Sequence, residues 1–167
     1  MSKSTPNQIR SLSVAPSSRG FGFAVLEGES RLVDWGVKSA TGDKNSHCLA
    51  EVEKLIIFYR PAVLVLEEAT STRRSPRVQE LNTQLLDLAK QHTIKVKLLS
   101  RAKVRGAFFA DGEGTKEALA ALLAECFPEE LTPRLPPKRR LWMSEAHAMG
   151  IFDAVALGLA LRLPKQG

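Results

Sequence analysis

A short, continuously apolar segment is the feature of this sequence that most constrains its fold. Residues 62–66 read Ala-Val-Leu-Val-Leu, and Glu67 ends the run. Strands with one exposed face alternate apolar and polar residues, whereas strands covered on both faces are apolar throughout. The run therefore predicts an interior, parallel strand in a sheet that carries helices on both faces.

The segments around this strand have the periods expected of an α/β chain. Alternating or mostly apolar residues predict earlier strands over 9–15, 19–26 and 31–38, and their short connections indicate an antiparallel meander. Helical spacing predicts four helices, over 43–59, 76–92, 115–127 and 151–163. One further apolar run predicts a strand over 94–99. The proline-containing segment 128–140 is predicted to be a loop.

This element order predicts an α/β fold built on a five-stranded mixed sheet, an antiparallel meander continued by parallel strands, with helices on both faces. The 167 residues, 44% of them hydrophobic, are enough for one ordinary core. We expect residues 1–8 to form a flexible N-terminal segment and residues 9–167 to form one domain.

The balance of charge points to a polyanionic partner. Lys and Arg number 24 against 18 Asp and Glu, giving a net charge of +6, which suits nucleic acid. The start is polar and no apolar run approaches the roughly 20 residues of a membrane span, so we expect no membrane partner and a cytoplasmic location. Cys48 and Cys126 lie far apart in helical segments and are expected to be buried free thiols.

Several short motifs, in matching order, resemble those of one family. They are Ser-Val-Ala-Pro-Ser at 13–17, Gly-Phe-Ala-Val at 22–25, Tyr-Arg-Pro at 59–61, Val-Leu-Glu at 65–67 and Asp-Ala-Val-Ala at 153–156. Together they resemble the RuvC-like Holliday-junction resolvases of the ribonuclease H-like superfamily, over nearly the whole chain. The resemblance implies a ribonuclease H-like fold, a DNA partner, a homodimer and a metal-dependent nuclease site.

The resemblance assigns two acidic residues to that site. Glu67 ends the interior strand, Asp153 lies near the start of the last helix, and both would be catalytic residues and ligands of Mg²⁺ or Mn²⁺. Cleavage of this kind uses two ions about 4 Å apart, held by carboxylates. Two positions depart from the family: Ala15 stands where a first-strand aspartate is expected, and Gly150 where a second Asp or a His is expected.

Glu67 and Asp153 could each have a structural role instead. Acidic residues near them do not readily replace the two missing metal ligands. Glu67 would serve equally as a strand-end acid paired with an arginine, and Asp153 as an acid favoured near a helix N-terminus. Glu145 precedes Asp153 by a rise of about 12 Å in a continuous helix. Only a break at Gly150 would let Glu145 or His147 fold back, and Glu68 is expected to point away from Glu67.

Three basic groups are candidate phosphate contacts. Arg73, Arg74 and Arg77 lie in a hydroxyl-rich loop after Glu67 that leads into a helix, where guanidinium groups and free backbone N–H groups bind phosphates. The alternative is a solvated loop. Lys138, Arg139 and Arg140 form a second candidate patch, and Arg101, Lys103 and Arg105 are expected on one exposed helix face.

These features favour a domain that binds branched or duplex DNA. If active, it would be a structure-selective endonuclease using Mg²⁺ or Mn²⁺ with Glu67 and Asp153. The alternative is a catalytically inactive scaffold that binds DNA, RNA or a protein partner, for which Ala15 is the evidence, and an engineered Asp-to-Ala change would look the same. An ATP-binding module of the same superfamily is disfavoured because no phosphate-binding glycine loop is evident.

Overall fold

Five strands form one mixed sheet in the order β3-β2-β1-β4-β5. The computed structural model describes residues 9–29, 31–68, 75–136 and 147–163. The strands are β1 (Arg10–Ser17), β2 (Gly20–Glu27), β3 (Arg31–Ser39), β4 (Val63–Glu67) and β5 (Lys95–Leu99). The first three pair antiparallel, and β4 pairs parallel with both β1 and β5. The predicted meander and the interior parallel strand after it are therefore confirmed.

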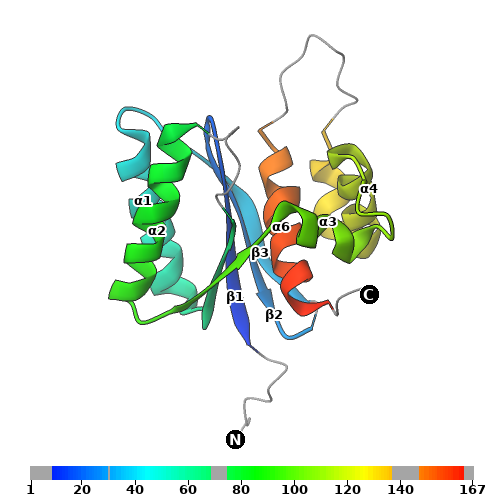
Figure 1. The fold of residues 1–167 in the computed structure, drawn as a ribbon, viewed down its shortest axis with the longest axis horizontal. Coiled ribbons are helices and arrows are strands. Elements are labelled where there is room, and N and C mark those ends of the chain that lie inside the picture. The colour runs from blue at the N-terminus through cyan, green and yellow to red at the C-terminus, as the bar shows by residue number, and fades with distance from the viewer. Residues whose placement is uncertain (1–8, 30, 69–74, 137–146, 164–167) are drawn as a thin grey trace, which may run out of the picture.

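Helices cover both faces of the sheet, as the continuous apolar run predicted (Figure 1). One face carries α1 (Lys44–Tyr59) and α2 (Pro76–Gln91). The other carries α3 (Arg101–Phe108), α4 (Lys116–Cys126), α5 (Pro128–Leu131) and α6 (Met149–Arg162). The α/β class and the mixed five-stranded sheet are thus as expected from the sequence, and each predicted helix is present with its ends moved by at most two residues.

The segment after α4 corrects the prediction of a loop over 128–140. Residues 128–131 form α5, and a 3₁₀ helix, η2 (Thr132–Arg134), follows. Pro128 takes the first helical position, where its missing N–H costs no hydrogen bond, and Leu131 is fully buried. Residues 137–140 of the predicted loop lie outside the described residues.

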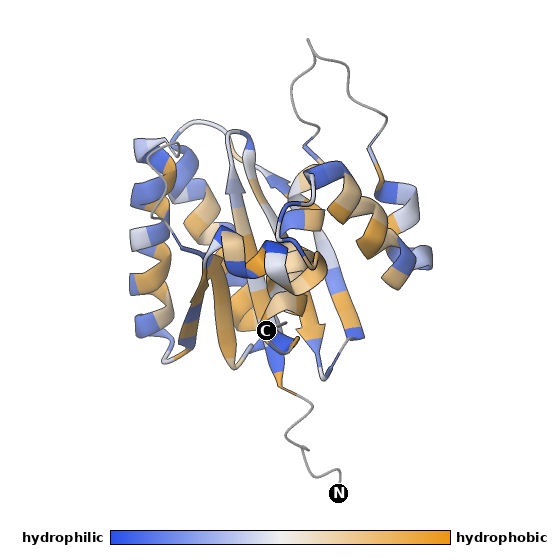
Figure 2. Cartoon of the chain, turned by 45° about the vertical axis from the view of Figure 1, so that its right-hand side comes forward, coloured by the Kyte–Doolittle hydropathy of each residue, from blue (hydrophilic) through white to orange (hydrophobic). Residues whose placement is uncertain are grey.

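Two cores lie on the two faces of the sheet because side chains alternate along each strand. Leu12, Val14, Leu64 and Leu66 pack under α1 and α2, whereas Val63, Val65, Ala24 and Leu26 pack under α6. The helices turn their apolar sides toward the sheet and their hydrophilic sides outward (Figure 2). The side chain of Cys48 is buried in the first core, but that of Cys126 is exposed at the end of α4, so the expectation of two buried thiols was wrong for Cys126.

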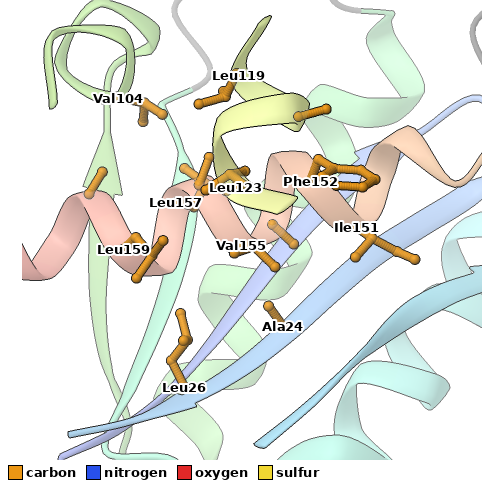
Figure 3. Packing of buried hydrophobic residues seen from close by; sticks show 14 of the residues in the cluster. Ala24, Leu26, Val104, Leu119, Leu123, Ile151, Phe152, Val155, Leu157 and Leu159 are labelled. Atoms are coloured by element: carbon orange, nitrogen blue, oxygen red, sulfur yellow. The ribbon is translucent and has the colours of Figure 1, made fainter. Parts of the chain in front are cut away.

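Helix α6 is the central element of the second core. It lies between Ala24 and Leu26 of β2 on one side and Leu119 and Leu123 of α4 on the other (Figure 3). A helix that is apolar on all sides must be covered on all sides, and eleven of its residues are buried. None of the helices in the described ranges is long and apolar enough to cross a membrane.

Candidate functional site

The two ends of the sheet differ in which groups they bring together. We call one the carboxyl edge: it holds the ends of β1, β3, β4 and β5 and the starts of β2 and α6, and it lies at the top of Figure 1. We call the opposite one the amino edge. Ligands of α/β sheets bind at the carboxyl ends of the parallel strands, so the carboxyl edge is where a site is expected.

Three positions singled out from the sequence meet at this edge, and we call them the acid corner: Ala15, Glu67 and Asp153. Strand β1 pairs with β4 in a register that sets Ser13 beside Val65, so its extension by two residues places Ala15 beside Glu67. Val65 lies on the α6 side of the sheet, and alternation puts Glu67 on the same side. Ala15 packs against the α6 core, so its methyl group takes the place of the carboxylate that the resemblance expects there.

A close approach of two glycines sets the start of α6 at the acid corner. Gly22 is the partner of Ala15 on β2, and a Cβ built on Gly22 would lie 2.1 Å from the carbonyl oxygen of Gly150. The backbone of α6 therefore rests directly on β2, which requires a residue without a side chain at position 22, whereas a Cβ on Gly150 would lie 3.2 Å from Gly22. Gly150 does not carry a ligand; its role in the fold is this contact, and Asp153 follows it on the same helix.

Asp153 has a partner that the sequence did not indicate. The ammonium Nζ of Lys116 lies 3.7 Å from Oδ2 of Asp153, and about a third of each side chain is exposed. Lys116 is the first residue of α4, whose N-cap Thr115 accepts a hydrogen bond from the backbone N–H of Ala118. The connection between α3 and α4 thus returns a cation to the acid corner.

The described residues do not make the two-ion centre that the resemblance implies. Ala15 offers no oxygen, Gly150 has no side chain, and Asp153 faces the Lys116 ammonium. Within residues 9–29, 31–68, 75–136 and 147–163, no group of three His, Cys, Asp or Glu side chains is placed to hold a metal ion. Glu67 and Asp153 are therefore half of a ligand set.

Cations from several elements lie at the carboxyl edge. Arg19 follows β1, Arg101 and Lys103 are exposed at the start of α3, and Lys116 starts α4. Lys44, at the start of α1, donates a hydrogen bond to the carbonyl oxygen of Ser18. Arg19, Lys44, Arg101 and Lys103 follow the ends of β1, β3 and β5, which lie at this edge, and Lys116 is placed there by its contact with Asp153.

Arg77 has contacts within the fold as well as a place at this edge. Its Nη1 donates to Oδ1 of Asn45 at 3.0 Å, and its Nη2 donates to the carbonyl oxygen of Ser17 at 2.6 Å. The side chain therefore ties α2 to α1 and to the end of β1. Its assignment to phosphate binding stays a prediction.

The third basic group is only partly as expected. Arg101 and Lys103 are exposed, but the relative exposure of Arg105 is only 8%. Its Nη1 has no hydrogen-bond partner among the described residues. Positions 105 and 108 share one face of a helix, and Phe108 packs against the α6 core. Spacing from Phe108 would have placed Arg105 on the packed face.

His147 lies at the carboxyl edge, and its contacts with the described residues do not indicate a role as a metal ligand. Its Nε2 lies 3.2 Å from Oγ of Ser39, at the end of β3. Burial and the nearby Arg19 guanidinium both lower the pKa of His147, so the imidazole is neutral at pH 7. The fold-back of His147 toward Asp153 considered from the sequence has no described contact to support it.

Comparison with solved structures identifies the fold. Neither a protein-family model nor a curated protein matches the chain by sequence. The structure of Thermus thermophilus RuvC superposes with a TM-score of 0.68 at 18% identity, over 91% of this chain and 92% of that one. The chain has the RuvC fold. T. thermophilus RuvC in complex with a Holliday junction substrate gives a TM-score of 0.67 at 18% identity, again over 91% and 92% of the two chains.

A viral protein shares the RuvC fold with a looser fit. The fowlpox virus Holliday junction resolvase matches with a TM-score of 0.53 and 14% identity, over 92% of this chain and 98% of that chain. The fold class expected from the sequence motifs is therefore confirmed over nearly the full length.

Several residues expected at the RuvC-like site lie outside the described residues. They are Arg73, Arg74, Lys138, Arg139, Arg140 and Glu145, and their assignments stay predictions. Sequence reasoning missed Lys116 altogether. The prediction of a helix over 115–127 included Lys116 in its first turn, but no pattern in the sequence indicated that this turn lies beside Asp153.

Proposed function

We propose that the protein binds branched or duplex DNA across the carboxyl edge of its RuvC-like sheet. The observation that carries the proposal is the gathering of cations from three separate segments at that edge: Arg19, Lys44, and Arg101 with Lys103. Cations that meet from different elements form a surface for a phosphate backbone, which supplies most of the affinity of DNA-binding proteins. The net charge of +6 acts in the same direction.

The solved relatives favour a branched DNA. One of the two T. thermophilus RuvC structures contains a Holliday junction substrate, and the viral protein is named a Holliday junction resolvase. The proposal extends to Arg73, Arg74, Arg77, Lys138, Arg139 and Arg140 as further phosphate contacts. It also includes a homodimer, which would present two equivalent edges to a symmetric junction, and a cytoplasmic location.

Salt dependence of junction binding tests this proposal. Affinity for a labelled four-way junction is measured by fluorescence anisotropy at several salt concentrations, for the wild type and for the double variant Arg101→Gln, Lys103→Gln. Each lost phosphate contact reduces the slope of log K against log salt by about 0.9, so the slope should fall by about 2.

The matched control removes the same charge elsewhere on the sheet. Lys95→Gln with Lys97→Gln neutralises two exposed lysines on β5, along its outer side rather than at its carboxyl end. This control should leave the slope within about 0.5 of the wild type. A double variant at 101 and 103 that binds with the wild-type slope would overturn the proposal.

A metal-dependent endonuclease is the second candidate function. The observation in its favour is the acid corner, which brings Glu67 and Asp153 to one edge beside the position of Ala15. Under this candidate Glu67 and Asp153 are catalytic residues that hold Mg²⁺ or Mn²⁺. Because the ligand set is half complete, we expect the wild type to bind junctions and cleave them slowly or not at all.

Restoring the missing carboxylate distinguishes the two candidates. Cleavage of a four-way junction with Mn²⁺ is compared for the wild type, Ala15→Asp and the double variant Ala15→Asp, Glu67→Gln. New cleavage in Ala15→Asp that disappears with Glu67→Gln would show that the residue at position 15 decides whether the site is catalytically active. Wild-type cleavage abolished by Glu67→Gln alone would instead establish the endonuclease and exclude the inactive scaffold.

A further inference from the structure

The acid corner carries an internal cation where the fold's resemblance implies metal ions. Asp153 has the Lys116 ammonium 3.7 Å from its Oδ2, and Ala15 and Gly150 supply no ligand atoms. The described residues thus give Asp153 a positive partner without any bound ion. This arrangement does not fit a two-ion metal centre, and the difference points to a role for the Lys116 ammonium.

Lys116 is held at this place by the backbone around it. Thr115 caps α4 through its Oγ1, and the ring of Phe109 packs against Gly114, where a built Cβ would lie 2.0 Å from a ring carbon. Asp111 accepts a hydrogen bond from the backbone N–H of Glu113 in the same connection. The loop from α3 to α4 is therefore folded on itself and fixes where α4 begins.

Packing between α4 and α6 fixes the other half of the pair. Leu119 and Leu123 of α4 are buried against the α6 core, in which Phe152 is next to Asp153 in sequence (Figure 3). Because both helices are locked into one core, Lys116 and Asp153 are brought together by the fold. The N-terminus of α4 adds its own partial positive charge beside the carboxylate.

A cation in this position has two consequences. It neutralises Asp153, which would otherwise repel a DNA phosphate at this edge. It also repels a divalent ion approaching the same carboxylate, and Mg²⁺ requires oxygen ligands in near-octahedral geometry, which an ammonium cannot supply.

We propose that the Lys116 ammonium takes the charge-neutralising place of a divalent ion beside Asp153, so that the binding of Mg²⁺ or Mn²⁺ at this carboxylate is weakened. This inference goes beyond the proposed function and does not depend on DNA binding.

Direct measurement of Mn²⁺ binding tests the role of Lys116. Free Mn²⁺ is followed by electron paramagnetic resonance in titrations of the full chain, for the wild type, Lys116→Met and Lys116→Gln. Removal of one positive charge about 4 Å from a ligand oxygen should tighten Mn²⁺ binding by about tenfold or more. Adding Asp153→Asn to Lys116→Met should abolish that gain.

Two control variants separate the contact from charge in general. Lys116→Arg keeps the cation and should keep the weak Mn²⁺ binding of the wild type. Lys103→Met removes an exposed cation from the same edge and should leave Mn²⁺ affinity within about twofold. A change below about twofold in both Lys116→Met and Lys116→Gln, with thermal unfolding as the check that each is folded, overturns the proposal.

Discussion

The two edges of the sheet handle their charges in opposite ways. At the amino edge, the side chain of Arg162 donates hydrogen bonds to five acceptors. They are the carbonyl oxygens of Gly28, Gly158, Ile9 and Leu26 and the Oγ of Ser11, at distances of 2.5–3.2 Å. At the carboxyl edge, by contrast, Arg101 and Lys103 are exposed to solvent.

This difference separates an edge whose cations are used by the fold from an edge whose cations are exposed. Arg162 joins the end of α6 to β1 and β2, and burial lowers the pKa of its guanidinium without removing its charge near pH 7. Arg10 ties the start of β1 to Glu27 and to the carbonyl oxygen of Tyr59 in the same way. A cation whose donors are used by the fold stabilises it, whereas an exposed cation is available to a phosphate.

The largest effect on stability is expected at the amino edge. Arg162→Met leaves several partly buried acceptors without donors, so we expect the free energy of unfolding to fall by about 3 kcal/mol. Urea unfolding followed by circular dichroism measures it. Where the variant is folded, its junction affinity should match that of the wild type, because Arg162 lies at the edge opposite the cations.

Arg134→Met is the matched control for that substitution. Arg134 is an exposed residue of η2, and its replacement should change the free energy of unfolding by no more than about 0.5 kcal/mol. Equal losses in Arg162→Met and Arg134→Met would remove the distinction between a cation used by the fold and an exposed one.

The next largest effect is expected at the glycine contact of the carboxyl edge. Gly22→Ala places a Cβ 2.2 Å from the carbonyl carbon of Gly150, which is backbone, so α6 must shift. We expect a loss of about 2 kcal/mol in the free energy of unfolding, typical of overpacking. Unlike Arg162→Met, this variant should also weaken junction binding when folded, because the start of α6 moves.

Gly106→Ala serves as the control for the glycine substitution. A Cβ on Gly106 meets no atom within 4 Å, and the residue lies inside α3. Alanine in a helix interior should therefore add about 0.5 to 1 kcal/mol of stability. A similar gain in Gly22→Ala would show that α6 does not rest on β2.

The same comparison shows what the sequence could predict. The run that ends at Glu67 predicted an interior parallel strand, and strand-end logic brought Ala15 and Glu67 to one edge, because these inferences need only local periods. Gly150 was interpreted as a missing ligand. Its contact with Gly22 joins segments far apart in the chain, and no local pattern encodes it.

Pairs between distant segments were the part that could not be predicted. The Lys116 and Asp153 contact depends on how the connection after α3 folds back, and the five hydrogen bonds of Arg162 depend on where α6 ends. Arg105 is the intermediate case. Its charge suggested exposure, while its helical spacing from Phe108 indicated the buried face on which it lies.

A smaller loss of unfolding free energy is expected when the hydrogen bond between Tyr59 of α1 and Asp34 of β3 is removed. The hydroxyl of Tyr59 donates a hydrogen bond to Oδ2 of Asp34, and Tyr59→Phe should cost about 1 kcal/mol of unfolding free energy. Burial first, and then the bond to Asp34, raise the pKa of Tyr59 to about 12. Because a raised pKa stabilises the folded state only while the group is protonated, this contribution is complete below the unfolded value of about 10.

The pH dependence provides the control for Tyr59→Phe. Urea unfolding at several pH values should give a constant difference between wild type and variant up to about pH 10, and the difference should shrink as pH rises toward 12. A difference that grows over that interval would contradict the assignment of the hydroxyl as the donor to Asp34.

The smallest effect is expected for the ion pair at the amino edge. Nη2 of Arg10 lies 2.9 Å from Oε2 of Glu27, and the two side chains are 35% and 24% exposed. Exposed pairs of this kind contribute little, so Glu27→Gln should cost about 0.5 kcal/mol, less in high salt because the charges are screened. Urea unfolding at low and high salt measures it, with Glu125→Gln, an exposed acid of α4, as the control. A loss above about 2 kcal/mol would show that this pair, and not Arg162 alone, holds the amino edge together.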